Sequence, residues 1–310
     1  MPKKLIILLS LICLVFFVSA CKKTADNTRV TNTNTNTTPA WQEQGVVVSG
    51  QYADAEILDL GNSQYRLYYA AEPETPDFAG QIYSSVSSDG ITWTKEEGVR
   101  KTWAVFFDVV KLPDGRFRAY FQNDQVIKSA VSEDGLNWTD EPGVRIDKSE
   151  PGFNLESVGA QSTYLLPDKT YIMVYRGTIN EPYETSEKVP NQTTQLYFWA
   201  SSRDGLAWEK KGLAFDSRNE TLYGLADGAE WVKWDNGELR VYFWSYAGIY
   251  RTVYSSGAFS APVFDWSNNE NANLKFVPNP PCDPTLEKIN GAWFMYYGQH
   301  AKGIYYAAYK

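Results

Sequence analysis

Apolar and polar residues alternate along most of the chain after residue 40, and the alternation is clearest in five short aromatic segments. Alternation with a period of two, in stretches rich in aromatic and β-branched residues, is typical of strands. The segments lie at residues 65–69, 117–121, 171–175, 239–243 and 293–297. Their starts are 52, 54, 68 and 54 residues apart. Repeating all-strand units of about 50 residues predict an all-β fold, a five-bladed β-propeller, because a sixth blade would need about 50 more residues.

Each unit should supply one blade whose first strand lies next to the propeller axis. We expect these inner strands at residues 57–60, 109–112, 162–166, 231–234 and 285–289. We expect the third strands at residues 81–87, 126–132, 195–201, 248–255 and 303–309. The fifth unit ends after its third strand. Residues 44–49 should therefore provide its outer strand, pair with residues 303–309 and close the ring with an N-terminal strand, which removes two exposed edges.

A second repeat, S-x-D-G-x-x-W, should join the third strand to the outer strand in the first three blades. It begins at Ser87, Ser132 and Ser202 and ends at Trp93, Trp138 and Trp208. The Asp-Gly pair supplies the positive φ that a tight hairpin needs, and the Trp opens the next strand. We therefore interpret this motif as structural.

The first forty residues have a different character. Lys3 and Lys4 precede an apolar run at residues 5–18, and Val-Ser-Ala leads directly into Cys21. This pattern is typical of a secretory signal and resembles a bacterial lipobox. We predict a lipoprotein signal peptide at residues 1–20, a lipidated Cys21 with a flexible Thr/Asn-rich tether at residues 21–40, and the propeller domain at residues 41–310. The protein should then be extracytoplasmic and anchored by lipid to a bacterial membrane, at its periplasmic face or at the cell surface.

The composition narrows the kinds of partner and metal site that we expect for the protein. The chain has 310 residues, with 29 Lys and Arg against 37 Asp and Glu, one His and a net charge of −8. This balance argues against nucleic acid as a partner, because nucleic-acid binding requires a basic surface. The sequence has no Cys or His cluster for zinc. Carboxylates and carbonyls at the axis would suffice for calcium, so an axial calcium ion stays open, and no cofactor is required.

Candidate site residues gather on one face of the predicted propeller. Inner strands start on the face that also carries the loops between second and third strands; we call it the funnel face, and the opposite one the hairpin face. Acidic residues stand at or before the inner strands, namely Asp54, Glu56, Asp108, Glu156, Asp227, Glu230 and Asp283. His300 and a long insert at residues 178–193 also lie on the funnel face. A funnel ringed by carboxylates can supply a general acid and a general base for a glycosidic bond.

Two inner strands carry a more specific pattern. Asp283-Pro-Thr-Leu precedes Gly291 and the aromatic segment at 293–297, and Asp54-Ala-Glu-Ile-Leu precedes the segment at 65–69. Together with the Asp-Gly hairpins, these features resemble the five-bladed propeller glycosidases of the arabinanase–fructosidase superfamily. That superfamily contains glycoside hydrolase families 43 and 32 and their phosphorylase relatives. The resemblance covers residues 41–310.

The resemblance implies roles for individual residues. Asp54 matches the general base on the first inner strand, with Ala55 in place of the usual Pro, and Glu230 matches the general acid from a later blade. The family's third acid, which tunes the pKa of the general acid, is expected on the third inner strand. There the chain reads Gly-Ala-Gln-Ser at residues 159–162. Asp108 or Glu156 would have to take that place.

We predict a substrate-binding role for the remaining candidates on the funnel face, Glu56, Glu156, Asp227, Asp283 and His300. His300 resembles a central histidine that helps to hold a metal or a water cluster in some family members.

Three functions follow from these observations. The leading interpretation is a monomeric, lipid-anchored glycoside hydrolase, inverting by default within family 43, with carboxylates about 6.5–9.5 Å apart to admit water. The absent third carboxylate favours a second, a non-catalytic propeller that binds sugar through aromatic platforms. A sialidase is the third, but sialidases have six blades and a converging arginine triad. Here Arg66, Arg118 and Arg240 recur at one position of the aromatic strands, which marks them as blade architecture.

Overall fold

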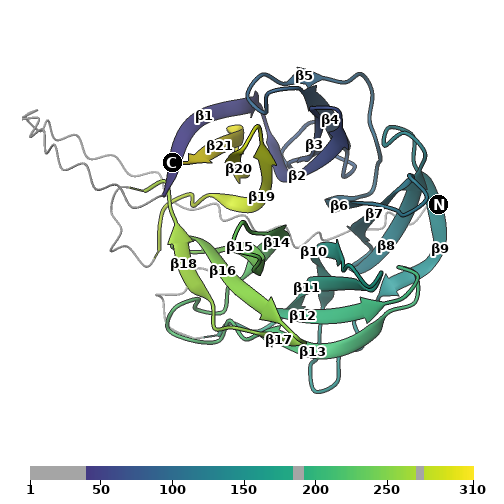
Figure 1. The fold of residues 1–310 in the computed structure, drawn as a ribbon. Coiled ribbons are helices and arrows are strands. Elements are labelled where there is room, and N and C mark those ends of the chain that lie inside the picture. Colours follow the sequence, from purple (N-terminus) through teal and green to yellow (C-terminus); the bar gives the residue numbers. More distant parts are fainter. Residues whose placement is uncertain (1–39, 184–191, 270–275) are drawn as a thin grey trace, which may run out of the picture.

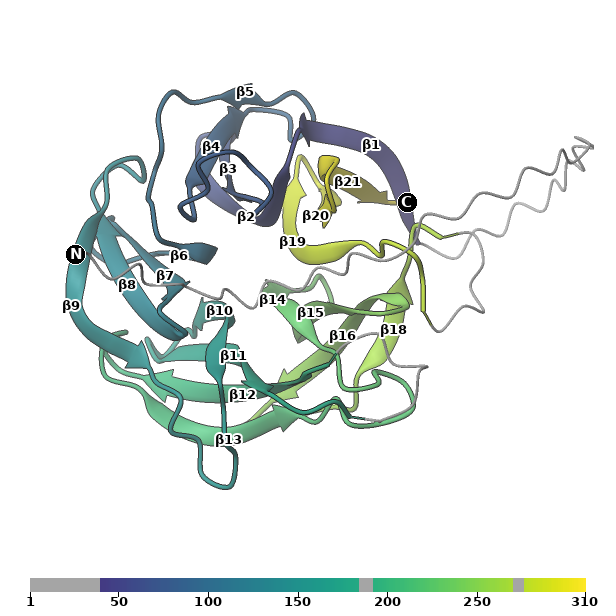
Figure 2. The same ribbon diagram turned by 180° about the vertical axis from the view of Figure 1, so that it is seen from behind.

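A computed structural model describes residues 40–183, 192–269 and 276–310. Five antiparallel sheets surround a central axis in these residues, as Figures 1 and 2 show from the two faces. Every regular element of the described segments is a strand, so none of them contains a helix long and apolar enough to cross a membrane. The predicted all-β, five-bladed propeller is confirmed. The predicted signal peptide, Cys21 and all but the last residue of the tether lie outside the described residues.

The first three blades follow the same path from the axis to the rim. Blade one comprises β2 (Tyr52–Gly61), β3 (Gln64–Ala71), β4 (Ile82–Ser87) and β5 (Thr94–Lys95). Blade two comprises β6 (Val105–Lys111), β7 (Phe117–Asn123), β8 (Val126–Ser132) and β9 (Thr139–Ile146). Blade three comprises β10 (Ser157–Leu165), β11 (Tyr171–Ile179), β12 (Thr194–Ser202) and β13 (Glu209–Phe215).

The last two blades depart from this path at their outer strands. Blade four comprises β14 (Asp227–Lys233), β15 (Leu239–Ser245) and β16 (Gly248–Ser255), whose outer edge pairs with both β17 (Ala258–Phe259) and β18 (Val263–Trp266). Blade five comprises β19 (Cys282–Ile289), β20 (Ala292–Gln299) and β21 (Gly303–Tyr309), with β1 (Trp41–Ser49) as its outer strand.

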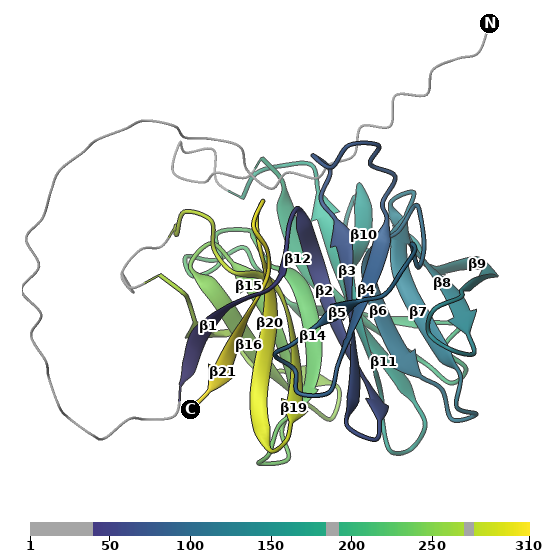
Figure 3. The same ribbon diagram turned by 90° about the horizontal axis from the view of Figure 1, so that it is seen from above.

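Strand β1 closes the ring. It lies antiparallel to β21, with Trp41 opposite Tyr309 and Ser49 opposite Gly303, and Figure 3 shows the two strands side by side. The predicted N-terminal closure is confirmed, and the strand begins three residues before the expected residue 44. Because third strands end on the hairpin face, Trp41 and Tyr309 both lie there.

Five large clusters make up most of the apolar core, each shared by two neighbouring blades, and a small sixth one forms around Leu225 and Tyr246. The aromatic strands contribute to two clusters at once. In β3, Leu67 and Tyr69 pack against blade five, whereas Tyr68 and Ala70 pack against blade two. Alternate side chains of one strand therefore enter different cores, which explains why these strands are apolar on both faces.

The Asp-Gly hairpins also bind neighbouring blades to each other. Tyr68 of blade one donates its hydroxyl to the carbonyl of Gly135 in blade two, at 2.8 Å. Tyr120 reaches Gly205 in blade three, and Tyr296 reaches Gly90 across the seam between blades five and one. A Cβ on Gly135 would lie 2.6 Å from Arg66 Nη1. The glycine is therefore needed both for the turn, where φ is 71°, and for contact with the next blade.

Candidate active site

A bulge interrupts each inner strand close to its start. One residue at each bulge has a φ between 44° and 55°; these residues are Asp54, Phe106, Ala160, Gly228 and Asp283. A side chain in this region costs on the order of 1 kcal/mol, and β-bulges are common next to active sites. The inner strands start three to five residues earlier than expected. Most of the predicted acids therefore lie inside the strands at the bulges, which corrects their expected place at or before the strand starts.

Asp54, Asp227 and Asp283 form the upper carboxyl group, at the funnel-face end of the axis. Asp54 Oδ2 accepts the backbone N–H of Phe106 in the next blade, at 3.3 Å, and its carboxyl shares a hydrogen bond with that of Asp283. Trp244 donates from Nε1 to Asp283 Oδ1 at 3.0 Å. Burial, followed by repulsion within the group, raises the pKa of Asp54 to about 7 and that of Asp283 well above its ordinary value.

Arg176, in β11, supplies the positive charge of this group. Its Nη1 lies 2.6 Å from Asp227 Oδ1, its Nη2 donates to Gln122 Oε1 at 3.2 Å, and its guanidinium lies 5.0 Å from the ring centre of Phe106. Both side chains of the ion pair are buried, with 8% and 10% of their surface exposed. The guanidinium lowers the pKa of Asp54 and thereby opposes part of the effect of burial.

The side chains two residues after each positive-φ residue form a second ring around the axis. Its members are Glu56, Asp108, Ser162, Glu230 and Thr285. Four of them accept a backbone N–H from the next blade: Glu56 from Val109 at 3.3 Å, Ser162 from Trp231 at 3.0 Å, Thr285 from Ile57 at 3.1 Å, and Asp108 from Thr163. This ring therefore ties adjacent inner strands together.

Glu56, Asp108 and Glu230 of this ring form the lower carboxyl group. Glu230 Oε2 accepts a hydrogen bond from Ser162 Oγ at 3.1 Å, and Glu230 and Glu56 share a hydrogen bond. Burial raises the pKa of Asp108 to about 7. Burial, followed by the neighbouring carboxylates, raises the pKa of Glu56 and of Glu230 well above their ordinary values. Glu230 thus retains its proton at a pH where an ordinary Glu is ionised, as a general acid requires.

The structure brings six of the predicted residues together in these two groups and places two elsewhere. The side chain of Glu156 is exposed, just before β10. His300 Nδ1 lies 3.1 Å from Glu72 Oε1, which links the loops of blades five and one. The predicted insert connects β11 to β12, but its residues 184–191 lie outside the described residues. The roles assigned to all eight residues stay predictions.

A small cavity of about 30 Å³ opens at the axis. It is lined by residues 54–56, 106–108, 160–161, 228–229 and 283–284 of the five inner strands. Asp54, Glu56, Asp108 and Asp283 reach it directly, and Glu230 meets it through Glu56. This space admits one or two water molecules, whereas sites that enclose small ligands measure about 300–1,000 Å³. A sugar would have to lie across the mouth of the cavity.

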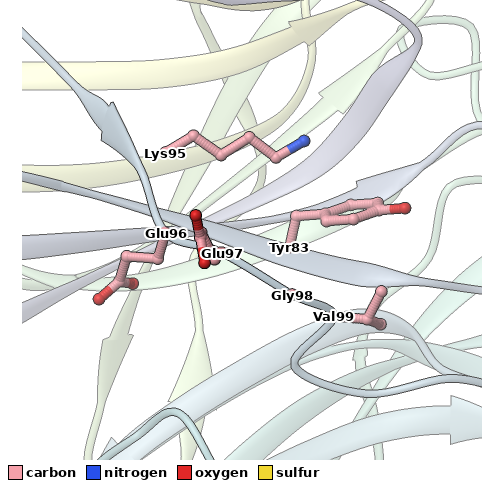
Figure 4. Close-up of a pocket in the computed structure, with 6 residues that line it drawn as sticks. All are labelled: Tyr83, Lys95, Glu96, Glu97, Gly98 and Val99. Carbon is pink, nitrogen blue, oxygen red and sulfur yellow. The ribbon is translucent and has the colours of Figure 1, made fainter.

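A second hollow lies on the outside of blade one and is lined by Tyr83, Val99 and residues 95–98 (Figure 4). Two of its charged groups, Lys95 and Glu96, already have partners within the blade. The Lys95 ammonium lies 4.4 Å from the ring centre of Tyr83 and donates to the Tyr52 hydroxyl, and Glu96 binds Arg66. We therefore place the candidate site at the axis.

An axial calcium ion, which the sequence left open, stays an untested possibility. Among the described residues, no three acidic, histidine or cysteine side chains are arranged to hold a metal ion. In the upper carboxyl group, Arg176 already neutralises Asp227, which leaves few free oxygens for an ion that needs six to eight.

Comparison with known proteins identifies the architecture. No protein-family model matches the sequence, and no curated protein matches it. Among solved structures, a protein of unknown function from Dyadobacter fermentans superposes with a TM-score of 0.59 at 13% identity, covering 88% of this chain and 99% of that one. A thermostable family-43 glycoside hydrolase superposes with 0.58 at 15% identity, covering 84% and 89%. A glycosyl hydrolase from Bacteroides ovatus gives 0.59 at 13%, covering 84% of each.

This protein is a five-bladed β-propeller whose structural neighbours are glycoside hydrolases. At these identities the likeness concerns the fold. Any function must therefore be argued from the residues at the axis.

Sequence reasoning missed Arg176 and Phe106. Arg176 directly follows the aromatic segment at residues 171–175 within β11, and its importance depends on Asp227, which is 51 residues away. Aligning the five blades would have singled out the position of Arg176. The second-strand residue that pairs with the first residue of the bulge is different in every blade. These residues are Ala70, Gln122, Arg176, Trp244 and Gly298.

Proposed function

We propose that this protein is a lipid-anchored, extracytoplasmic glycoside hydrolase that cleaves a glycan lying across the mouth of the axial cavity. The observation that carries the proposal is the position of Asp54 in that cavity with a pKa raised to about 7. A general base is most effective when its pKa lies near the working pH. In this role Asp54 activates a water molecule in the cavity, and protonated Glu230 supplies the acid.

The proposal includes inversion of the anomeric centre. Asp54 belongs to the upper carboxyl group and Glu230 to the lower one, and each has different electrostatic neighbours. Placement in two successive carboxyl groups along the axis fits the wider carboxyl separation of inverting enzymes, about 6.5–9.5 Å, which leaves room for a water molecule.

The test is hydrolysis of a broad panel of bacterial and plant glycans and aryl glycosides, with the anomer of the first product read by NMR. Asp54→Asn should lower turnover by about 10²–10⁴, the usual contribution of a positioned acid or base. Glu230→Gln should do the same on natural glycans and less on aryl glycosides, whose leaving groups need little protonation. Glu133→Gln is the matched control, because Glu133 is exposed in the hairpin between β8 and β9 and outside both groups.

Two outcomes would contradict the assignment. Full turnover by Glu230→Gln on a natural glycan would remove Glu230 as the acid. A product with retained configuration would remove the inverting mechanism. Thermal unfolding of each variant shows whether a loss of activity reflects a loss of fold.

A second candidate, a carbohydrate-binding propeller without catalysis, is favoured by blade three. It holds Ala160 and Ser162 at its two axial positions, whereas each of the other blades holds a carboxylate at one or both of them. In that case the wild type binds glycans, for example in affinity electrophoresis, but hydrolyses none of them, and Asp54→Asn leaves the affinity nearly unchanged.

The lipid anchor at Cys21 is part of the proposal and has its own test. In a bacterial host, the wild-type protein should incorporate a fatty-acid probe and sediment with membranes. Cys21→Ala should do neither. A wild-type protein that is secreted without lipid would remove the anchor but leave the proposed chemistry intact.

A further inference from the structure

Trp103 stands apart from the other tryptophans of the chain. All eleven lie within the described residues, and the other ten are buried or half-buried in and around the blades. Trp103 is 58% exposed, the largest exposure among the large apolar side chains that face solvent. Burying an aromatic ring is worth several kcal/mol in general, so the fold forgoes that gain at this one position.

The backbone holds Trp103 in this position from both sides. Its φ is 58°, a conformation that costs a side chain on the order of 1 kcal/mol. Its N–H donates to the carbonyl of Ala79 in blade one, at 2.6 Å, and its carbonyl accepts from Asn123 Nδ2 in blade two, at 2.6 Å. A Cβ on Gly80 would lie 3.0 Å from the backbone of Ala104, so this approach requires a glycine. The outward position of Trp103 is therefore built into the contacts of two blades.

Trp103 lies on the funnel face, in the segment that leads from β5 to β6. Three residues later, Phe106 lines the axial cavity next to Arg176. Three residues of chain span at most about 11 Å. The exposed indole and the mouth of the cavity are thus separated by no more than the length of a short oligosaccharide.

We propose that Trp103 is the stacking platform of a sugar subsite beside the axial cavity. The C–H-rich face of a pyranose ring would lie on the indole, whose π-face is electron-rich, while hydroxyl groups at the edge of the next ring reach the axial carboxyls. The exposed apolar surface is a single ring held in place, whereas protein-binding patches extend over several hundred Å². This geometry fits a sugar unit better than a protein partner. The inference rests on the proposed function, since it names the subsite of that same glycan.

The test is affinity for a glycan that the wild type binds, measured by titration calorimetry. Trp103→Ala should weaken binding about tenfold or more, and Trp103→Phe should recover most of the affinity, because a smaller aromatic face remains. Phe264→Ala is the matched control, because Phe264 is 47% exposed on β18 at the rim of blade four. Fluorescence gives a second readout. Acrylamide should quench Trp103 in the free wild type, the glycan should protect it, and Trp103→Phe should abolish the protected component.

The outcomes separate the two proposals. If the wild type binds and hydrolyses glycans but Trp103→Ala binds them equally well, the platform is wrong and the proposed function stands. If the wild type neither binds nor hydrolyses any glycan of the panel, both are wrong. Protection of Trp103 by a protein or by a quaternary ammonium compound, but not by glycans, would also overturn the platform.

Discussion

Arg176 and Asp227 form a buried ion pair that joins blade three to blade four beside the axis. Blade three lacks an acid at its bulge, where Ala160 stands, and instead contributes a cation from its second strand. The cation lowers the pKa of Asp54, the proposed base. Blade three thus contributes to the charge at the axis through an arginine of its second strand and not through a carboxylate of its inner strand.

Removing this cation should be costly. Arg176→Met leaves the Asp227 carboxylate buried without its partner, and breaking a buried pair in this way typically costs about 3–5 kcal/mol of unfolding free energy. Urea unfolding measures the change. The double variant Arg176→Met with Asp227→Asn should recover part of the loss. Arg116→Met is the control, because Arg116 pairs with Asp114 on the surface, and it should have no measurable effect. Equal losses of unfolding free energy in Arg176→Met and Arg116→Met would refute the importance of the buried pair.

Stability should fall as the pH rises from about 4 to 8. The pKa of Asp54 and of Asp108 is about 7 in the folded protein, against an ordinary value of 3.8. Between these values the folded state binds more protons than the unfolded state, so the stabilisation is complete below about pH 4 and is lost as the pH passes 7. Each kcal/mol lost should lower Tm by roughly 2–4 °C. Calorimetry at pH 5 and pH 8 measures this, and Asp54→Asn should flatten the dependence. A higher Tm at pH 8 than at pH 5 would contradict the buried protonated state.

Two glycine variants can separate the free-energy contribution of the contact between blades at the hairpins from that of the turn conformation itself. Gly135→Ala introduces a Cβ 2.6 Å from Arg66 Nη1 and 2.7 Å from the Tyr68 hydroxyl, at a φ of 71°. Gly115→Ala, at a φ of 95°, places its Cβ in open space. Gly115→Ala should cost about 1–2 kcal/mol from backbone strain alone. Gly135→Ala should cost a further 1–3 kcal/mol from overpacking. If chemical denaturation gives equal losses, the hairpin glycine serves only its own turn.

The closing strand should be indispensable for the monomeric fold. A protein that starts at Trp41 should unfold at the same temperature as the longer chain. One that starts at Gly50 loses β1, exposes the edge of β21 and loses the hydrogen bond from Trp41 Nε1 to Asp265. We expect a lower Tm and association through the open edge, which light scattering would detect. A stable monomer that starts at Gly50 would show that the ring does not need this strand.

The fold could be predicted because its signal is repeated and local. Each aromatic strand must fill two cores, so its composition is conspicuous in every blade. An additional signal was present in the outer strands. Glu-x-Gly-Val occurs at Glu43, Glu96 and Glu141, and Val46, Val99 and Val144 remain exposed. This match alone would have identified residues 43–46 as part of an outer strand.

The axial site was only partly predictable. Acid positions followed from the repeat, but their arrangement depends on the bulges, which the alternation of apolar and polar residues does not reveal. Asp54 and Asp283 are 229 residues apart in the chain, yet their carboxyls share a hydrogen bond because the last blade closes onto the first. Likewise, neither Glu156 nor Asp108 could be assigned from the sequence alone, although the structure leaves one exposed and places the other at the axis.

The direction of β1 determines which face of the domain the proposed lipid anchor would be attached to. The strand starts at Trp41, opposite Tyr309, and both residues lie on the hairpin face. A lipid on Cys21 would therefore pull on the hairpin face, so the axial cavity and Trp103 would point away from the bilayer. Twenty residues of flexible tether attached at that face would let the domain stand off and tilt, and its mouth would remain accessible to polymers in the surrounding medium.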